Sequence, residues 1–141
     1  MLENESAEIS FRVSDDLNHW NGLNRIKAVI LRIRFGGIII NYDKVQVKLN
    51  RQLLPDFILK KVDMTYRLVD QASSSHSITP YGYAYDYYLD RNNYPKRGRN
   101  YLTVTLLKRD PNIAQEFSID RVDCRIEYQF HQHYEEEPLQ Y

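Results

Sequence analysis

Apolar and polar residues alternate along most of this chain, and the alternation is clearest in residues 28–35, AVILRIRF. A period of two indicates a strand with one face in the core and the other face in water. The other stretches with this period are residues 9–13, 42–50, 64–69, 101–107 and 121–130. The residues expected to face the core are Ile9, Phe11, Val13, Val29, Leu31, Ile33, Phe35, Val45, Val47, Leu49, Met64, Tyr66, Leu68, Leu102, Val104, Leu106, Val122, Cys124, Ile126, Tyr128 and Phe130. We expect Val104 and Ile126 to be fully buried.

Helix signals are few and short. Ser14 is a plausible N-cap for one turn that begins at the Asp15–Asp16 pair, and Pro55 suits the first position of a second turn. Strands joined by turns, with under about a fifth of the residues in helices, form two sheets packed face to face. We therefore predict an all-β fold, a two-sheet antiparallel jelly-roll sandwich with one or two short helical turns.

The chain of 141 residues has the size of one domain. We assign residues 1–130 to a single β-sandwich domain and residues 131–141 to a polar, acidic tail that is partly disordered. The Ser-rich connection at 69–80 is expected to be mobile.

Two stretches carry a resemblance to a known family. Residues 43–55, DKVQVKLNRQLLP, and residues 93–107, NYPKRGRNYLTVTLL, resemble the pattern V-x-V-x-L-N-G-x-x-L … G-x-N-x-L-x-V-x-L of galactose-binding-like jelly-roll domains. Such domains include the sugar-binding domains of family 2 glycoside hydrolases. The whole chain is also similar to C-terminal β-sandwich domains of multidomain environmental bacterial proteins. Arg51 stands where the family has Gly, but Asn50 tolerates positive φ, so the turn survives. The resemblance implies a scaffold and does not locate a ligand.

Composition removes several classes of partner. The 19 basic and 19 acidic side chains cancel, so no overall field attracts nucleic acid or an anionic membrane. No apolar run approaches the ~20 residues of a membrane helix. The N-terminal MLENESAEIS has neither the basic start nor the apolar segment of a signal peptide. Cys124, the single cysteine, is expected to be an inert core thiol.

Residues 81–95, YGYAYDYYLDRNNYP, raise the question of whether a row of tyrosines forms a binding platform or a core strand. If the stretch is extended, the odd-numbered residues face one way, and this side is the more apolar. We therefore expect Tyr83, Tyr85 and Tyr87 to point inward with Leu89. The residues expected on the other side, or outside the core, are Tyr81, Gly82, Ala84, Asp86, Tyr88 and Tyr94.

The rings outside the core suggest a glycan. Sugars stack their C–H faces on aromatic rings while amides, carboxylates and guanidinium groups bond their hydroxyls. The candidate ligand-binding residues are Tyr88, Asp90, Arg91, Asn93, Tyr94 and Trp20, and Asn92 has similar chemistry. Trp20 either packs under a loop or is exposed as a stacking ring.

The first functional hypothesis is a non-catalytic carbohydrate-binding module that contacts glycan through these loop-edge residues. The alternative is a structural or interaction module that packs against neighbouring domains of a longer protein or against an identical copy. The chain has no G-x-S-x-G elbow, P-loop, H-E-x-x-H motif or Cys–His pair, so we expect no enzyme.

Metal and anion signals are weak, and we expect no cofactor. Asp15 and Asp16 could hold a structural Ca²⁺ together with carbonyl oxygens, by resemblance to the family, but the ligand density of a calcium loop is missing. His131 and His133 would share one face of a strand, and no third ligand is marked. The basic loop residues, which could hold a phosphate or a sulfated sugar, are Lys96, Arg97, Arg99, Lys108 and Arg109.

Overall fold

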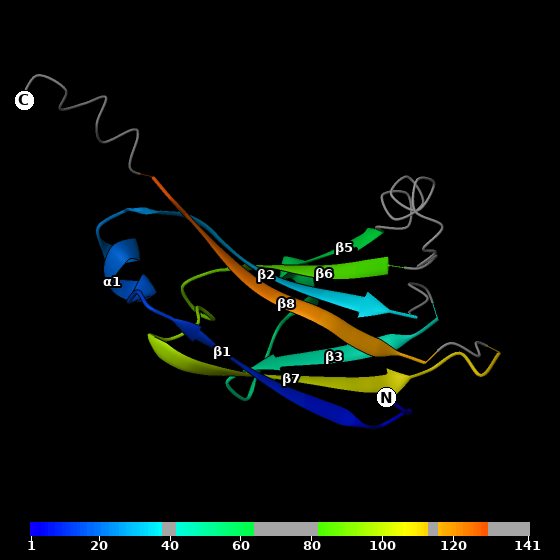
Figure 1. Cartoon of the computed structure of the whole chain (residues 1–141). Coiled ribbons are helices and arrows are strands. Elements are labelled where there is room, and N and C mark those ends of the chain that lie inside the picture. Colours follow the sequence, from blue (N-terminus) through cyan, green and yellow to red (C-terminus); the bar gives the residue numbers. More distant parts are fainter. Residues whose placement is uncertain (38–41, 64–81, 113–115, 130–141) are drawn as a thin grey trace, which may run out of the picture.

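The computed structural model describes residues 1–37, 42–63, 82–112 and 116–129. These residues form two four-stranded antiparallel sheets packed face to face (Figure 1). The first sheet has the order β1 (Ser6–Val13), β7 (Gly98–Lys108), β3 (Lys44–Leu49) and β4 (Gln52–Leu53). The second has the order β5 (Leu59–Asp63), β6 (Gly82–Leu89), β2 (Ile26–Gly36) and β8 (Ser118–Tyr128). The helical turns are α1 (Leu17–Gly22) and η1 (Asp56–Ile58). The predicted all-β sandwich with short helical turns is confirmed.

The core lies between the sheets and is built by the predicted alternation. The inward residues of β2 and β7 are buried, and Val104 is 0% exposed as expected. Ile126 is different, because it is only partly buried against the core. The prediction of full burial was wrong because β8 is an edge strand, which among the described residues pairs only with β2.

The tyrosine row is a core strand. Tyr85 and Tyr87 are each 2% exposed, and Tyr83 packs against the core. Tyr88 has the opposite phase and is 45% exposed, as predicted. Tyr94 was expected outside the core, but it is half-buried and packs against it, so that expectation was wrong. Its loop returns the chain from β6 to β7 across the end of the sandwich, which brings the ring inward. Tyr81 lies outside the described residues.

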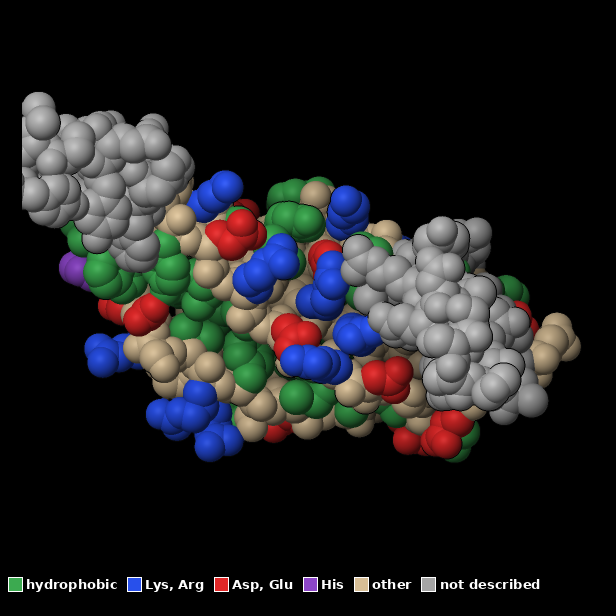
Figure 2. All heavy atoms as spheres, turned by 45° about the horizontal axis from the view of Figure 1, so that its top comes forward, with side chains coloured by type: hydrophobic (Ala, Val, Ile, Leu, Met, Phe, Trp, Pro, Cys, Tyr) green, Lys and Arg blue, Asp and Glu red, His purple; other side chains and the backbone are tan. Residues whose placement is uncertain are grey.

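The outer face of the second sheet carries a row of alternating charges. Lys60, Asp86, Arg32 and Asp123 stand in register across its four strands. Arg32 donates two hydrogen bonds of 2.7 Å to the Asp86 carboxylate, which raises the pKa of Arg32. Asp86 therefore points outward as predicted and is still buried. Figure 2 shows basic and acidic side chains interleaved over this side of the molecule.

The helical turns and one strand differ from the sequence-based expectation. The N-cap of α1 is Asp16, whose carboxylate accepts a hydrogen bond of 3.2 Å from the His19 amide, and not Ser14. Pro55 precedes η1 as its cap instead of occupying the first position of the turn. Strand β5 directly after η1 was not predicted. The predictions for residues 64–69, 69–80 and 131–141, with His131 and His133, lie outside the described residues.

The hairpin between β3 and β4 has the predicted turn. Asn50 and Arg51 both have positive φ, 49° and 71°, between the paired residues Leu49 and Gln52. Two central residues with positive φ match the twist of a two-residue hairpin. Asn tolerates this conformation, but Arg51 is held in a region that disfavours residues with a Cβ.

We therefore predict that Arg51→Gly stabilises the protein by about 0.5–1 kcal/mol. Glycine adopts positive φ without strain, and the greater conformational entropy of the unfolded chain with glycine offsets only part of this gain. The midpoint of urea unfolding should rise at an unchanged slope. Gln52→Gly, one residue later in extended β4, is the matched control and should lower the midpoint. A neutral or destabilising Arg51→Gly would contradict this account of the turn.

Candidate functional site

A groove of about 620 Å³ opens between the two sheets beside β3. Its floor is made of Val45 and Val47 from β3 and of Tyr85 and Tyr87 from β6. The chain segment that crosses from β4 to β5 forms one wall. The remaining lining residues are Lys44, Gln46, Leu53, Leu54, Pro55, Asp56, Leu59, Lys61 and Leu107. This volume lies in the range of ligand-binding clefts in proteins.

The groove is open because β4 is too short to cover β3. Strand β4 pairs only with Lys48 and Leu49, and the Leu54 amide donates a hydrogen bond of 3.0 Å to the Val47 carbonyl. Backbone groups alternate in direction along a strand, so the amide and carbonyl of Val45 also point away from β7. Within the described part of the chain, no strand pairs with that side of Val45. The groove thus contains an unpaired backbone edge.

Two phenol hydroxyls reach the groove from its floor. Among the described residues, neither Tyr85 nor Tyr87 has a hydrogen-bond partner for its hydroxyl, and no buried side-chain oxygen lacks a partner. Both hydroxyls are therefore in contact with the solvent of the groove. Burial, with smaller contributions from Asp43 and Asp56, raises the pKa of Tyr85 to about 12. Burial also raises the pKa of Tyr87. Both groups remain neutral donors at physiological pH.

Two lysines give the groove a positive character. Lys61 stands on the inward phase of β5, opposite Tyr85, and its ammonium lies 5.4 Å from the centre of that ring. Lys44 lines the mouth at the start of β3. Neither ammonium has an acidic partner among the described residues. Against these two cations the lining has one carboxylate, Asp56.

Exposed apolar side chains surround the groove. Leu53 and Leu107 line it and are 53% and 44% exposed. Phe57, which follows Asp56 in η1, is 84% exposed. Single exposed apolar residues are ordinary, but two that line one groove, with a third next to the lining residue Asp56 in the sequence, offer a surface that a partner could cover.

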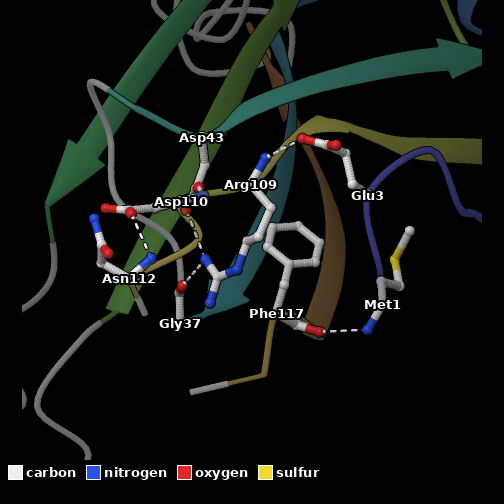
Figure 3. Close-up of polar contacts among 8 residues, drawn as sticks. All are labelled: Met1, Glu3, Gly37, Asp43, Arg109, Asp110, Asn112 and Phe117. Atoms are coloured by element: carbon white, nitrogen blue, oxygen red, sulfur yellow. Dashed lines mark hydrogen bonds and ion pairs between the residues drawn. The ribbon is translucent and has the colours of Figure 1, made fainter. Parts of the chain in front are cut away.

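The start of β3 is fixed by the fully buried carboxylate of Asp43. This carboxylate accepts hydrogen bonds of 2.7 Å from the Arg109 guanidinium and from the Asp110 amide. The guanidinium also donates to the Gly37 carbonyl, just beyond β2 (Figure 3). Arg109, expected in a basic loop that could hold an anion, is instead a structural clamp between β2, β3 and β7.

The other end of β3 is fixed by Asn100, which is 0% exposed. Its side-chain oxygen accepts 2.8 Å hydrogen bonds from the Asn50 amide group and the Lys96 backbone amide. Its side-chain nitrogen donates to the carbonyls of Lys96 and Gly98, and Gly98 has φ of 98°. The L-N and G-x-N positions of the sequence pattern are thus parts of one buried junction.

The structure uses most of the predicted glycan-binding residues as scaffold. Asn93 is buried, and its side-chain oxygen accepts a 2.8 Å hydrogen bond from the Asp90 amide. The Asp90 carboxylate accepts from the Asn92 amide, which closes the same turn. Tyr94 packs against the core, and burial raises its pKa.

Trp20 also packs against the core, with its ring edge-on to Tyr128 at 6.4 Å. Of its two expected placements, packing is the one found. Only Tyr88 and Arg91 of the predicted set are exposed. The hydroxyl of Tyr128 donates to Asp15, so that carboxylate is also engaged.

Sequence reasoning missed the groove. Lys61 and Lys44 lie beside apolar residues in the sequence and looked like ordinary solvated charges. The signal that could have found the site is the Pro55–Phe57 stretch, where an aromatic residue follows a proline in a region too short for a core helix. Lys61 lies at an inward position of β5, so this strand lacks the alternation of apolar and polar residues that predicts a strand. The sequence therefore predicted only a helical turn after Pro55.

No metal site or membrane helix is found among the described residues. They contain no cluster of three or more His, Cys, Asp or Glu residues that could hold a metal ion. None of their helices has the length and apolar character needed to cross a membrane. Cys124 is a free thiol whose burial raises its pKa to about 11. Comparison of the chain with protein-family models, curated proteins and solved structures found no match.

The buried tyrosines predict a specific alkaline transition. The folded-state pKa of Tyr85 is about 12, above the ~10 of an unfolded tyrosine, so the folded state holds this proton more tightly. The resulting stabilisation is complete below about pH 10 and is lost as the pH rises toward 12. Urea unfolding should therefore show a fall in stability over this window, and Tyr85→Phe should reduce the fall. Tyr101→Phe, at an exposed position, should leave the fall unchanged. Equal behaviour of the two variants would contradict the assignment.

Proposed function

We propose that this domain is a non-catalytic interaction module whose groove binds an extended segment of another polypeptide. The observation that carries the proposal is the backbone edge of β3 at Val45, which pairs with no strand of the described residues and lies inside a groove with an exposed apolar rim. Extended peptides bind such edges through main-chain hydrogen bonds, and neighbouring pockets select their side chains.

The rim supports a polypeptide partner. Phe57, Leu53 and Leu107 can be covered by a second protein surface, and aromatic side chains contribute strongly to such contacts. The two tyrosines that line the groove, Tyr85 and Tyr87, are each only 2% exposed, so they offer little ring surface for sugar stacking. The resemblance to galactose-binding-like domains is consistent with a non-catalytic scaffold.

Carbohydrate binding at the α1 end of the sandwich is the second candidate. It rests on Tyr88, which is 45% exposed on β6, and on the exposed Arg91 in the loop that follows. Fewer residues would contact the sugar than the sequence predicts, because Asp90, Asn93, Tyr94 and Trp20 are engaged in the fold.

Selection from a library of random peptides of about ten residues tests the polypeptide-binding function. We expect selected peptides to bind the domain and to lose at least about tenfold in affinity when Phe57→Ser and Leu107→Ser are combined, because the bound peptide would no longer remove these two exposed apolar side chains from water. Affinity is measured by fluorescence anisotropy.

Leu2→Ser and Leu23→Ser, at exposed positions that do not line the groove, form the matched control pair and should leave the affinity unchanged. The same urea midpoint for both double variants would show that the fold is preserved. Absence of any selected peptide, or binding that is indifferent to the rim, would overturn the proposal.

The carbohydrate candidate predicts a different result. Tyr88→Ala should weaken retention on a polysaccharide in affinity electrophoresis and leave stability within about 1 kcal/mol, because the ring is exposed. Phe57→Ser should not affect retention. Unchanged retention of the wild type and Tyr88→Ala across a broad glycan panel would eliminate this candidate.

A further inference from the structure

We infer that the segment bound in the groove adds a strand to β3 at Val45 and carries acidic side chains that reach Lys44 and Lys61. This inference rests on the proposed polypeptide-binding function and specifies the chemistry of the partner. It follows from the geometry of the backbone edge, from the unmatched charges and from a comparison with the other sheet edges.

The backbone of Val45 supplies the first contact. Its amide and carbonyl point into the groove, and in the described residues no neighbouring strand takes them. Water can bond these groups, but an extended peptide can bond both at once and continue the sheet that β7 and β3 begin. Alternate side chains of such a peptide would point toward the floor formed by Tyr85 and Tyr87.

The charges select the side chains. Lys61 lies on the same inward face of β5 as Leu59, two residues earlier. At this position a core strand would carry an apolar residue. Its ammonium has a tyrosine ring near it and no described carboxylate. Lys44 likewise has no acidic partner among the described residues, and the Tyr85 and Tyr87 hydroxyls add two donors. A carboxylate satisfies ammonium and hydroxyl donors together.

The outer edges of β8 and β1 are poor sites for strand addition. The pairing of β8 with β2 has register shifts at both of its ends, and the outward residues of β8 are charged. Bulges and charges on edge strands discourage pairing. Strand β1 likewise alternates Glu8 and Arg12 with serines on its outward face. The β3 edge combines a free backbone with apolar surroundings.

A second copy of the chain is not the occupant that the charges favour. Pairing β3 with β3 of another copy would bring Lys44 and Lys61 of both molecules to the same groove region. Like charges placed together at an interface select against that partner. The lysines thus disfavour pairing of β3 with β3 of another copy and favour an acidic segment from a different polypeptide.

Two peptides of about eight residues test the inference, one alternating valine with glutamate and one alternating valine with glutamine. The glutamate peptide should bind more tightly, and added salt should reduce the difference. Lys61→Gln and Lys44→Gln should each weaken the glutamate peptide about threefold to fivefold, as expected for partly exposed ion pairs, and leave the glutamine peptide unchanged. Lys60→Gln, on the opposite face of β5, is the matched control and should change neither affinity.

Backbone pairing is tested separately by N-methylation of the glutamate peptide. Methyl groups on one set of alternate amides should abolish binding, while methyl groups on the other set should have little effect. Equal effects of both sets would overturn strand addition.

Equal affinity of the two peptides, still dependent on Phe57 and Leu107, would overturn the acidic preference and keep the proposed function. Failure of these peptides and of the whole library would overturn both. A dimer in sedimentation that Lys44→Gln strengthens would identify a second copy as the occupant and also overturn the inference.

Discussion

The buried carboxylate of Asp43 is the constraint on which the rest of the structure depends. A carboxylate that is completely removed from water is costly unless it is paired and hydrogen-bonded. Asp43 meets this requirement with the Arg109 guanidinium and the Asp110 amide, and the same guanidinium holds the Gly37 carbonyl. The end of β2, the start of β3 and the end of β7 are thereby tied together. Because β2 and β3 belong to different sheets, this contact fixes how one sheet stands over the other.

The second anchor, at Asn100, fixes the other end of the strand on which the proposed binding depends. With Asp43 before its first residue and the Asn50–Asn100 junction after its last, β3 is held at both ends by buried polar groups. Within the described part of the chain, no strand pairs with one side of its middle, because β4 is short. An edge held in this way loses little conformational entropy when another segment pairs with it, and such preorganisation favours binding. The two anchors therefore hold the open edge of β3 in place for the proposed partner strand.

The sequence was sufficient for the sandwich because its strands alternate without interruption. The run Val29–Phe35 needs only a period of two to assign its phase, and every predicted inward residue in it is buried. Ile126 has the same pattern but less burial, because burial also depends on whether a strand is central or at an edge. The pairing of Asp43 with Arg109 spans 66 residues and leaves no local signal. Strand β5 was missed because Lys61 interrupts the alternation of apolar and polar residues on which the assignment of a strand depends.

The tyrosines of β6 show why core and site could not be separated from the sequence. The alternation correctly turned Tyr85 and Tyr87 inward, and that result argued for a core strand and against a binding surface. In the structure their rings fill the core, with Tyr85 edge-on to Phe35 at 5.0 Å, while their hydroxyls stand in the groove. A tyrosine can do both because its apolar body and polar tip are separated by the length of the ring. Phenylalanine would pack as well but would present no donors to a ligand. Tyrosine at these inward positions therefore suits both the core, which its ring fills, and the open edge of the sandwich, where its hydroxyl lies.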